Sequence, residues 1–110
     1  MRYRPILTVA LLLAPLAARA TDSLPGTDAK VQTATKVFDD LVSAIGDGRS
    51  PPAFRIVPRG AAGGMQVAWF DPTARSVSIQ EETFDLCASL GIHENDALAV
   101  LLGHELVHYY

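Results

Sequence analysis

The chain has 110 residues, 49% of them hydrophobic and 19% charged, a composition that favours a packed core over disorder. The first 20 residues have the features of an export signal, and the remaining 90 suffice for one small domain but not for a multidomain enzyme. Three of the nine basic residues lie in that leader, so the rest of the chain carries six basic and twelve acidic residues, a net charge of −6. This balance argues against a nucleic-acid-binding surface. A single cysteine excludes an intrachain disulfide framework and a multi-cysteine zinc site.

The leader has the three parts of a cleavable signal peptide. Arg2 and Arg4 make a positive start, an apolar stretch covers residues 6–16, and Ala18 and Ala20 are the small residues before a cleavage site. The apolar stretch is shorter than the roughly 20 residues that a membrane-spanning helix needs. We therefore predict cleavage after Ala20, a periplasmic or secreted protein, and no membrane span in the mature chain. The alternative is a buried N-terminal helix.

The first half of the mature chain predicts one helix and one short strand. Apolar residues recur every three or four positions from Ala29 to Ile45, which predicts a helix with one face against a core. Gly46 suits a left-handed cap at its end, and a proline-rich linker follows. Residues 54–57 form a short extended run, and the glycine-rich residues 60–64 are expected to be a loop.

A β-hairpin and a second helix are predicted next. Residues 67–70 form the first strand, and residues 71–74 make a type I turn with a proline at its second position. Polar and apolar residues alternate in the return strand, Arg75 to Ile79. The aromatic pair Trp69 and Phe70 is expected to pack in the hairpin core, with substrate contact as the alternative. A helix from about Glu81 to Leu90 then carries Cys87 on its apolar side, as a buried small hydrophobe.

The last predicted helix begins near residues 93–95 and contains the sequence His-Glu-x-x-His. Apolar residues occur on nearly every face, so we expect this helix to be deeply buried. Four residues advance about 400° round an α-helix, so His104 and His108 project on the same side and can reach one zinc ion. Glu105 lies to one side of that pair, where it can act as a general base on water. A surface patch of these three residues, without metal, is the alternative.

The segment Leu101 to Tyr110 resembles the active-site helix of the zincin metallopeptidases. With the preceding hairpin and helix, from about Trp69, it is most similar to the gluzincin branch that includes HtpX and the CAAX prenyl proteases (metallopeptidase family forty-eight). The resemblance implies that His104 and His108 are zinc ligands and that Glu105 is the catalytic base. It also implies that the strand Arg75 to Ile79 is a candidate edge for pairing with an extended peptide substrate.

The family pattern requires a third zinc ligand, a glutamate on a later helix. His93 lies 11 residues before His104, about 16 Å along a continuous helix, and Glu94 and Asp96 are also too distant. The acidic cluster of Glu81, Glu82 and Asp85 is expected to be the polar start of a helix. We therefore expect the third ligand from sequence beyond Tyr110, with residues 21–110 as the N-terminal part of a truncated metallopeptidase-like domain and the pair Tyr109-Tyr110 left without covering.

Together these patterns predict an α+β fold with an N-terminal helix, a small antiparallel sheet and a buried zincin-type helix at the C-terminus. The predicted function is zinc-dependent hydrolysis of peptide bonds in a peptide or protein substrate, with Zn²⁺ as cofactor. The alternative is an exported, non-catalytic zinc-binding or interaction domain.

Overall fold

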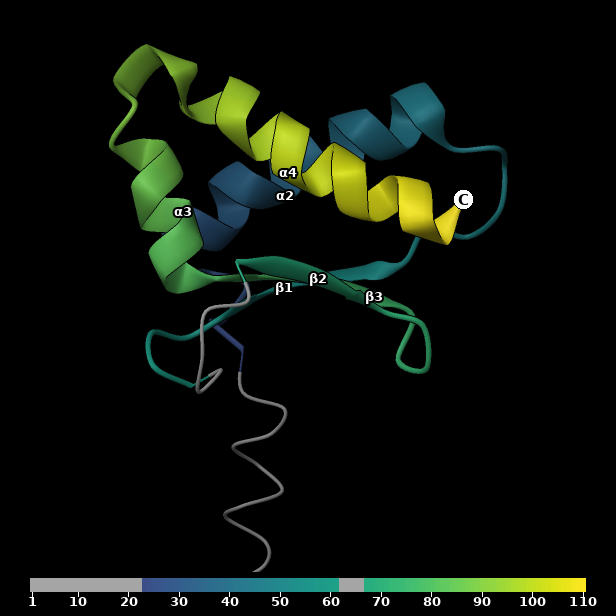
Figure 1. Ribbon diagram of the computed structural model, residues 1–110, viewed down its shortest axis with the longest axis horizontal. Helices are drawn as coiled ribbons and strands as arrows, with labels where there is room; N and C mark the ends of the chain where they lie inside the picture. The colour runs from purple at the N-terminus through teal and green to yellow at the C-terminus, as the bar shows by residue number, and fades with distance from the viewer. Residues whose placement is uncertain (1–22, 62–66) are drawn as a thin grey trace, which may run out of the picture.

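A computed structural model describes residues 23–61 and 67–110, and in this part of the chain three strands form a sheet that is covered on one face by helices (Figure 1). The predicted α+β class is confirmed. The predicted leader, residues 1–20, and part of the glycine-rich loop lie outside the described residues. No helix in the described part is long and apolar enough to cross a membrane. The elements are α2 (Ala29–Ile45), β1 (Ala53–Val57), β2 (Ala68–Asp71), β3 (Ser76–Gln80), α3 (Glu81–Ala88), the 3₁₀ turn η1 (Gly91–His93) and α4 (Glu94–Tyr109).

Helix α2 has the predicted limits because a side chain caps its start and a close contact determines its end. The Asp28 carboxylate accepts a hydrogen bond from the Lys30 backbone N–H (2.8 Å) and so satisfies one unpaired donor of the first turn. The prediction of a left-handed cap at Gly46 is wrong, because this residue has φ −66° and ψ 148°. Glycine is needed there for space, since a Cβ atom would lie 2.5 Å from the Val42 carbonyl oxygen.

The sheet has the order β1-β3-β2 and is mixed, so the prediction of an antiparallel sheet is wrong. Strand β3 folds back from the hairpin and pairs antiparallel with β2, with Trp69 opposite Ser78. Its other edge pairs parallel with β1, with Ile56 opposite Ile79. The hairpin is a local feature that its turn residues predict, but nothing in the short run 53–57 indicates which strand it pairs with or in which direction.

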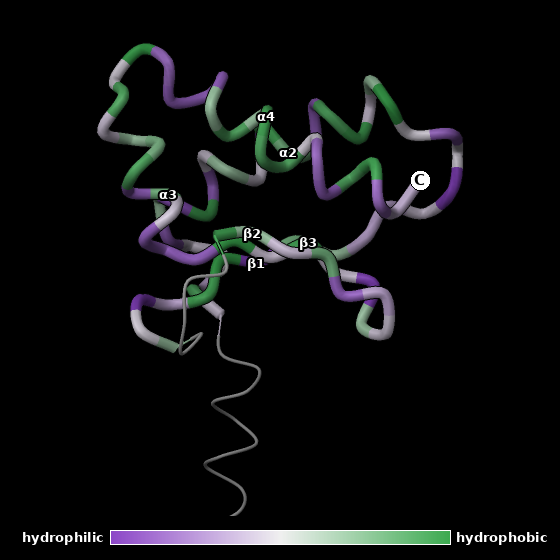
Figure 2. The backbone as a smooth tube through the Cα atoms, in the orientation of Figure 1, coloured by the Kyte–Doolittle hydropathy of each residue, from purple (hydrophilic) through white to green (hydrophobic). Residues whose placement is uncertain are grey.

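The hydrophobic core lies between the sheet and the helices, and α4 contributes only one of its faces. Leu98, Leu102 and Leu106 are fully buried, whereas the side chains of Val100 and Val107 are 72% and 69% exposed. Hydrophobic residues recur along α4 (Figure 2), and some of them therefore lie on its exposed face. The prediction that this helix is deeply buried is wrong for the described part of the chain. The core cluster comprises Ala34, Val37, Phe38, Ile56, Val77, Ile79, Phe84, Cys87, Leu98, Leu102 and Leu106.

An ion-pair network connects the start of α2 to α3. The Lys30 ammonium lies 2.7 Å from Glu81 and 2.8 Å from Asp85, and the Arg59 backbone N–H donates to Glu81 (3.0 Å). The hydrogen bond to Asp85, and then that to Glu81, raises the pKa of Lys30. The Lys30 hydrogen bond, followed by the Arg59 N–H, lowers the pKa of Glu81 below its ordinary 4.5. The acidic cluster therefore lies at the start of α3, as predicted, and in addition it connects α3 to α2, which was not predicted.

One-sided burial of α4 predicts that two substitutions on the same helix change stability by very different amounts. Leu102→Ala leaves a cavity in the core and is expected to lower the free energy of unfolding by about 2–5 kcal/mol. Val100→Ala removes a mostly exposed side chain, and the free energy of unfolding should stay within about 0.5 kcal/mol. Urea denaturation of both variants measures the difference. Equal losses would show that Val100 is buried and would contradict the one-sided packing.

Removal of the Lys30 ammonium is expected to lower stability in a pH-dependent manner. The depressed pKa of Glu81 means that its ionised form stabilises the fold above pH 4.5, and that this contribution is lost as the pH falls through the folded-state pKa. Lys30→Gln should therefore lower the melting temperature at pH 7, and the difference from the wild type should shrink towards pH 3. Lys36→Gln is the control, because Lys36 makes only an exposed pair with Asp40 (3.6 Å) and should change little.

Candidate metal centre

The buried leucines of α4 determine where the three motif side chains point. With about 100° of rotation per residue, Glu105 lies about 60° from the centre of the leucine stripe, His108 about 120° and His104 about 160°. Exposure increases with this angle: the Glu105 side chain, nearest to the leucines, is 12% exposed, and that of His104, farthest from them, is 70% exposed. The two imidazoles therefore lie at the surface and the Glu105 carboxylate is mostly buried, whereas the sequence predicts that all three groups are buried.

The two imidazoles have a separation that fits one zinc ion. His104 Nε2 and His108 Nε2 lie 3.4 Å apart, with the ring planes at 82°. Two nitrogens that each bind zinc at about 2.0–2.1 Å in a tetrahedral arrangement are separated by about 3.4 Å. The structure brings these two predicted ligands together, at a distance that also fits a hydrogen bond between the two nitrogens.

Glu105 lies next to this pair without sharing its position. Its Oε2 atom is 3.9 Å from His104 Nε2, which is beyond hydrogen-bond distance but close enough for one water molecule to contact both groups. The predicted base therefore faces the space beside the imidazoles.

A groove of about 530 Å³ runs between α4 and β2 at this site. His104, Glu105 and His108 form one wall, and Ala68, Trp69, Phe70 and Pro72 form the other. Ala68, Trp69 and Phe70 follow one another in β2, so their side chains point to alternating faces of the sheet. All three can line the same groove only if it runs along the edge of the strand. The groove therefore follows the outer edge of β2, and the expected aromatic pair contributes to it.

The outer edge of β2 presents backbone groups to the groove. Gln80 N–H donates to the Val67 carbonyl (3.2 Å), so Val67 and Gln80 form a hydrogen-bonded pair of the antiparallel ladder. Such pairs alternate along two antiparallel strands, so the backbone groups of Ala68 and Phe70 point away from β3. These two residues provide the edge beside the histidines.

The prediction that Arg75 to Ile79 is a free edge is wrong, because this strand is central and paired on both sides. Ala68 and Pro72 were not predicted to line the site, whereas Trp69 and Phe70 were predicted to contact substrate only as the alternative to core packing. No local signal identifies them, since either strand of a hairpin can become the outer one, and the choice depends on the distant strand β1.

A third ligand does not join the histidine pair within residues 23–61 and 67–110, where no cluster of three metal-ligating side chains occurs. His93 lies at the other end of α4, 3.6 Å from Asp96, as expected for a residue near a helix start. Glu81 and Asp85 form ion pairs with Lys30. Two ligands are therefore present where catalytic zinc sites use three.

The end of α4 is covered, in contrast to the prediction for Tyr109 and Tyr110. The Arg49 guanidinium lies 5.8 Å and 5.3 Å from the centres of the two rings, and it donates to the Tyr110 carbonyl (3.0 Å). The linker after α2 thus folds back over the last turn of α4. Its Asp47 carboxylate holds Arg49 in place and has a lowered pKa because of that hydrogen bond.

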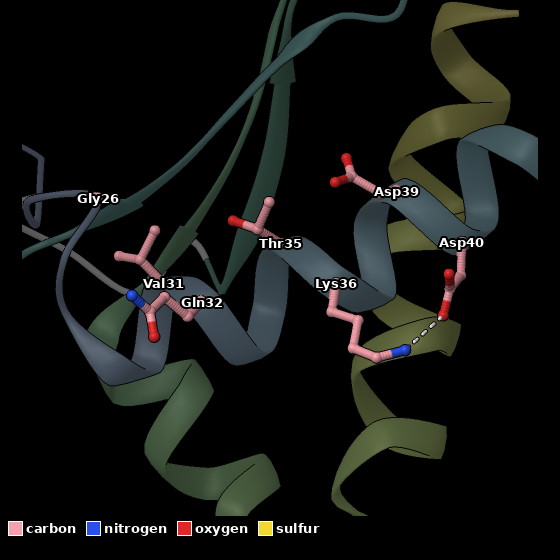
Figure 3. A pocket seen from close by; sticks show the side chains of 7 residues that line it. All are labelled: Gly26, Val31, Gln32, Thr35, Lys36, Asp39 and Asp40. Atoms are coloured by element: carbon pink, nitrogen blue, oxygen red, sulfur yellow. Dashed lines mark ion pairs between the residues drawn. The ribbon is translucent and has the colours of Figure 1, made fainter.

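Two other features of the described residues contain no histidine. A groove of about 580 Å³ on the outer side of α2, shown in Figure 3, has the exposed Lys36–Asp40 ion pair on its wall and shares no residue with the histidine groove. Cys87 is buried and free, as predicted, and burial raises the pKa of its thiol. Neither feature adds a ligand to the histidine pair.

No protein-family model, no curated protein and no solved structure matches the chain. The resemblance to the gluzincins therefore stays a prediction, which rests on the motif in α4 and on the hairpin and helix that precede it.

The geometry of the two imidazoles predicts that zinc binding requires both. His104→Ala and His108→Ala should each lower the affinity for Zn²⁺ by at least tenfold, because one imidazole alone cannot chelate the ion. His93→Ala is the matched control and should leave the affinity unchanged. Competition with a chromophoric chelator measures all three variants against the wild type. Zinc affinity that survives loss of either motif histidine would place the metal elsewhere.

Proposed function

We propose that the protein is a zinc-dependent peptidase that acts in the periplasm or outside the cell. The observation that carries this proposal is the 3.4 Å separation of His104 Nε2 and His108 Nε2 at the wall of a groove along β2. The outer edge of β2 pairs with no strand among residues 23–61 and 67–110. In this proposal the histidine pair binds the metal on one side of the groove, and the edge of β2 binds the peptide on the other.

Each motif residue has a distinct role in this proposal. His104 and His108 hold the metal through their Nε2 atoms. A zinc ion held there supplies a Lewis acid that polarises water and the carbonyl group of a peptide bond. Glu105 takes a proton from the attacking water and delivers it to the nitrogen of the leaving amine. Its mostly buried position beside His104 is suitable for this role.

The substrate in this proposal is an extended peptide segment bound along β2. The outward-facing backbone groups of Ala68 and Phe70 offer it two donors and two acceptors, in the manner of an added strand. Backbone pairing is independent of side-chain identity, so it places the scissile bond in the groove without selecting a particular sequence.

A third zinc ligand is still required. We propose that it comes from outside residues 23–61 and 67–110, as a glutamate on a further helix does in the gluzincin pattern. Val100 and Val107 lie on the outer face of α4 next to His104, so a segment that covers this apolar face could also bring a carboxylate to the metal.

The two-ligand arrangement also favours a second candidate, a non-catalytic zinc-binding domain. Such a domain would hold zinc through the histidines and would use the groove for binding alone. Glu105 distinguishes the two candidates because only hydrolysis needs a base.

The decisive substitution is Glu105→Gln, which keeps the size of the side chain and removes its basicity. We expect hydrolysis of a quenched fluorescent peptide library to fall by about 100- to 10,000-fold, while the affinity for Zn²⁺ stays the same. The assay uses the intact gene product with added Zn²⁺, so that every ligand the proposal requires is present, and a chelator should abolish the activity of the wild type.

Glu94→Gln, at the other end of the same helix, is the control and should keep full activity. If the wild type binds zinc but hydrolyses no peptide, the binding domain is supported instead. Hydrolysis that Glu105→Gln leaves intact would contradict the role of this carboxylate.

A further inference from the structure

Tyr109 follows His108 directly and makes polar contacts to two other segments. Its hydroxyl donates a hydrogen bond to the Ser50 carbonyl (2.5 Å) in the linker after α2. The same hydroxyl accepts a hydrogen bond from the Arg75 guanidinium, which also lies 5.5 Å from the centre of the Tyr109 ring. The last turn of α4 is thus attached to the linker and to the hairpin turn through one side chain.

The Tyr109 ring also touches the opposite wall of the histidine groove. It packs edge to face with Phe70 at a centroid distance of 5.8 Å, and Phe70 lines the groove from β2. Tyr109 therefore contacts one wall of the groove and is covalently adjacent to the histidine of the other wall.

Arg75 adopts an unfavourable backbone conformation at this contact. Its φ is 52°, in the left-handed region that residues other than glycine rarely occupy. The Asp71 carboxylate holds the turn by accepting from the backbone N–H groups of Thr73 (2.9 Å) and Ala74 (3.2 Å). A glycine would fit this backbone better, so the arginine side chain has to be explained by its contact with Tyr109.

We propose that Tyr109 is a positioning residue, supported by Arg75, that holds the last turn of α4 so that His108 stays at metal-binding distance from His104. Helix ends fray, and His108 lies in the final turn, where backbone hydrogen bonds alone hold it weakly. The proposal rests on the proposed function, because a position for His108 matters only if the pair binds zinc.

Two neighbouring tyrosines provide a matched pair of substitutions. Tyr109→Phe removes both hydroxyl hydrogen bonds and keeps the ring, so we expect the affinity for Zn²⁺ to fall about tenfold, as for other residues that orient metal ligands. Tyr110→Phe should leave the affinity unchanged, because the Tyr110 hydroxyl is buried without a hydrogen-bond partner among the described residues. Amide hydrogen exchange of His108 and Tyr110 in metal-free protein should be faster in Tyr109→Phe and unaltered in Tyr110→Phe.

A second variant separates positioning from stability. Arg75→Gly relieves the strained backbone and should raise the melting temperature by a few degrees or leave it unchanged, yet it should lower the affinity for Zn²⁺. A purely structural role predicts that stability and zinc affinity change in the same direction.

The outcomes distinguish this proposal from the proposed function. Wild-type zinc affinity in Tyr109→Phe, with unaltered amide exchange, overturns the positioning role and leaves the metal site intact. A wild type that binds no zinc overturns the proposed function and the positioning of a metal ligand with it. Tenfold weaker binding in Tyr109→Phe and Arg75→Gly, with normal binding in Tyr110→Phe, supports both.

Discussion

Burial of Leu98, Leu102 and Leu106 in the core between the sheet and the helices is the interaction on which the rest of the structure depends. Three leucines at four-residue spacing determine the rotation of α4 about its axis, and this rotation leaves no freedom in where the other side chains point. Glu105 then lies at the margin of the core, and the two histidines lie beyond it. The same packing brings α4 beside the outer edge of β2, so the groove is a consequence of the core.

This arrangement separates the residues whose burial stabilises the fold from the groups to which we assign the proposed chemistry. The apolar stripe supplies the burial, whereas the imidazole of His104 stays 70% exposed and keeps its contact with water. The two exposed imidazoles therefore impose little desolvation cost on folding, whereas the Glu105 side chain, at 12% exposed, is mostly removed from water. We therefore expect the domain to stay folded when either histidine is substituted, so zinc binding can be tested without a change in stability.

Local features of the sequence predicted the helices, the hairpin and the spacing of the motif, because periodicity, turn residues and helix geometry act over a few positions. The limits of α2 and the convergence of His104 and His108 follow from such short-range rules. The position of β1 beside β3 depends on residues that are 23 positions apart, Ile56 and Ile79, and no periodicity encodes that pairing. The free edge was assigned to the wrong strand of the hairpin for this reason. Gly46 shows the same limit, since its need for space arises at Val42 and at Tyr110, 64 positions away.

The apolar outer face of α4 explains why the sequence predicted deep burial and why the described residues do not provide it. Val100 and Val107 lie about 40–60° from His104 round the helix, and Gly103, about 100° from His104, has open space above its backbone. Exposed β-branched residues and a mid-helix glycine both lower the stability of an isolated helix, so neither is accounted for by the described fold. If the histidine pair holds zinc, as proposed, a further ligand and a cover for Val100 and Val107 would both lie on the His104 side of α4.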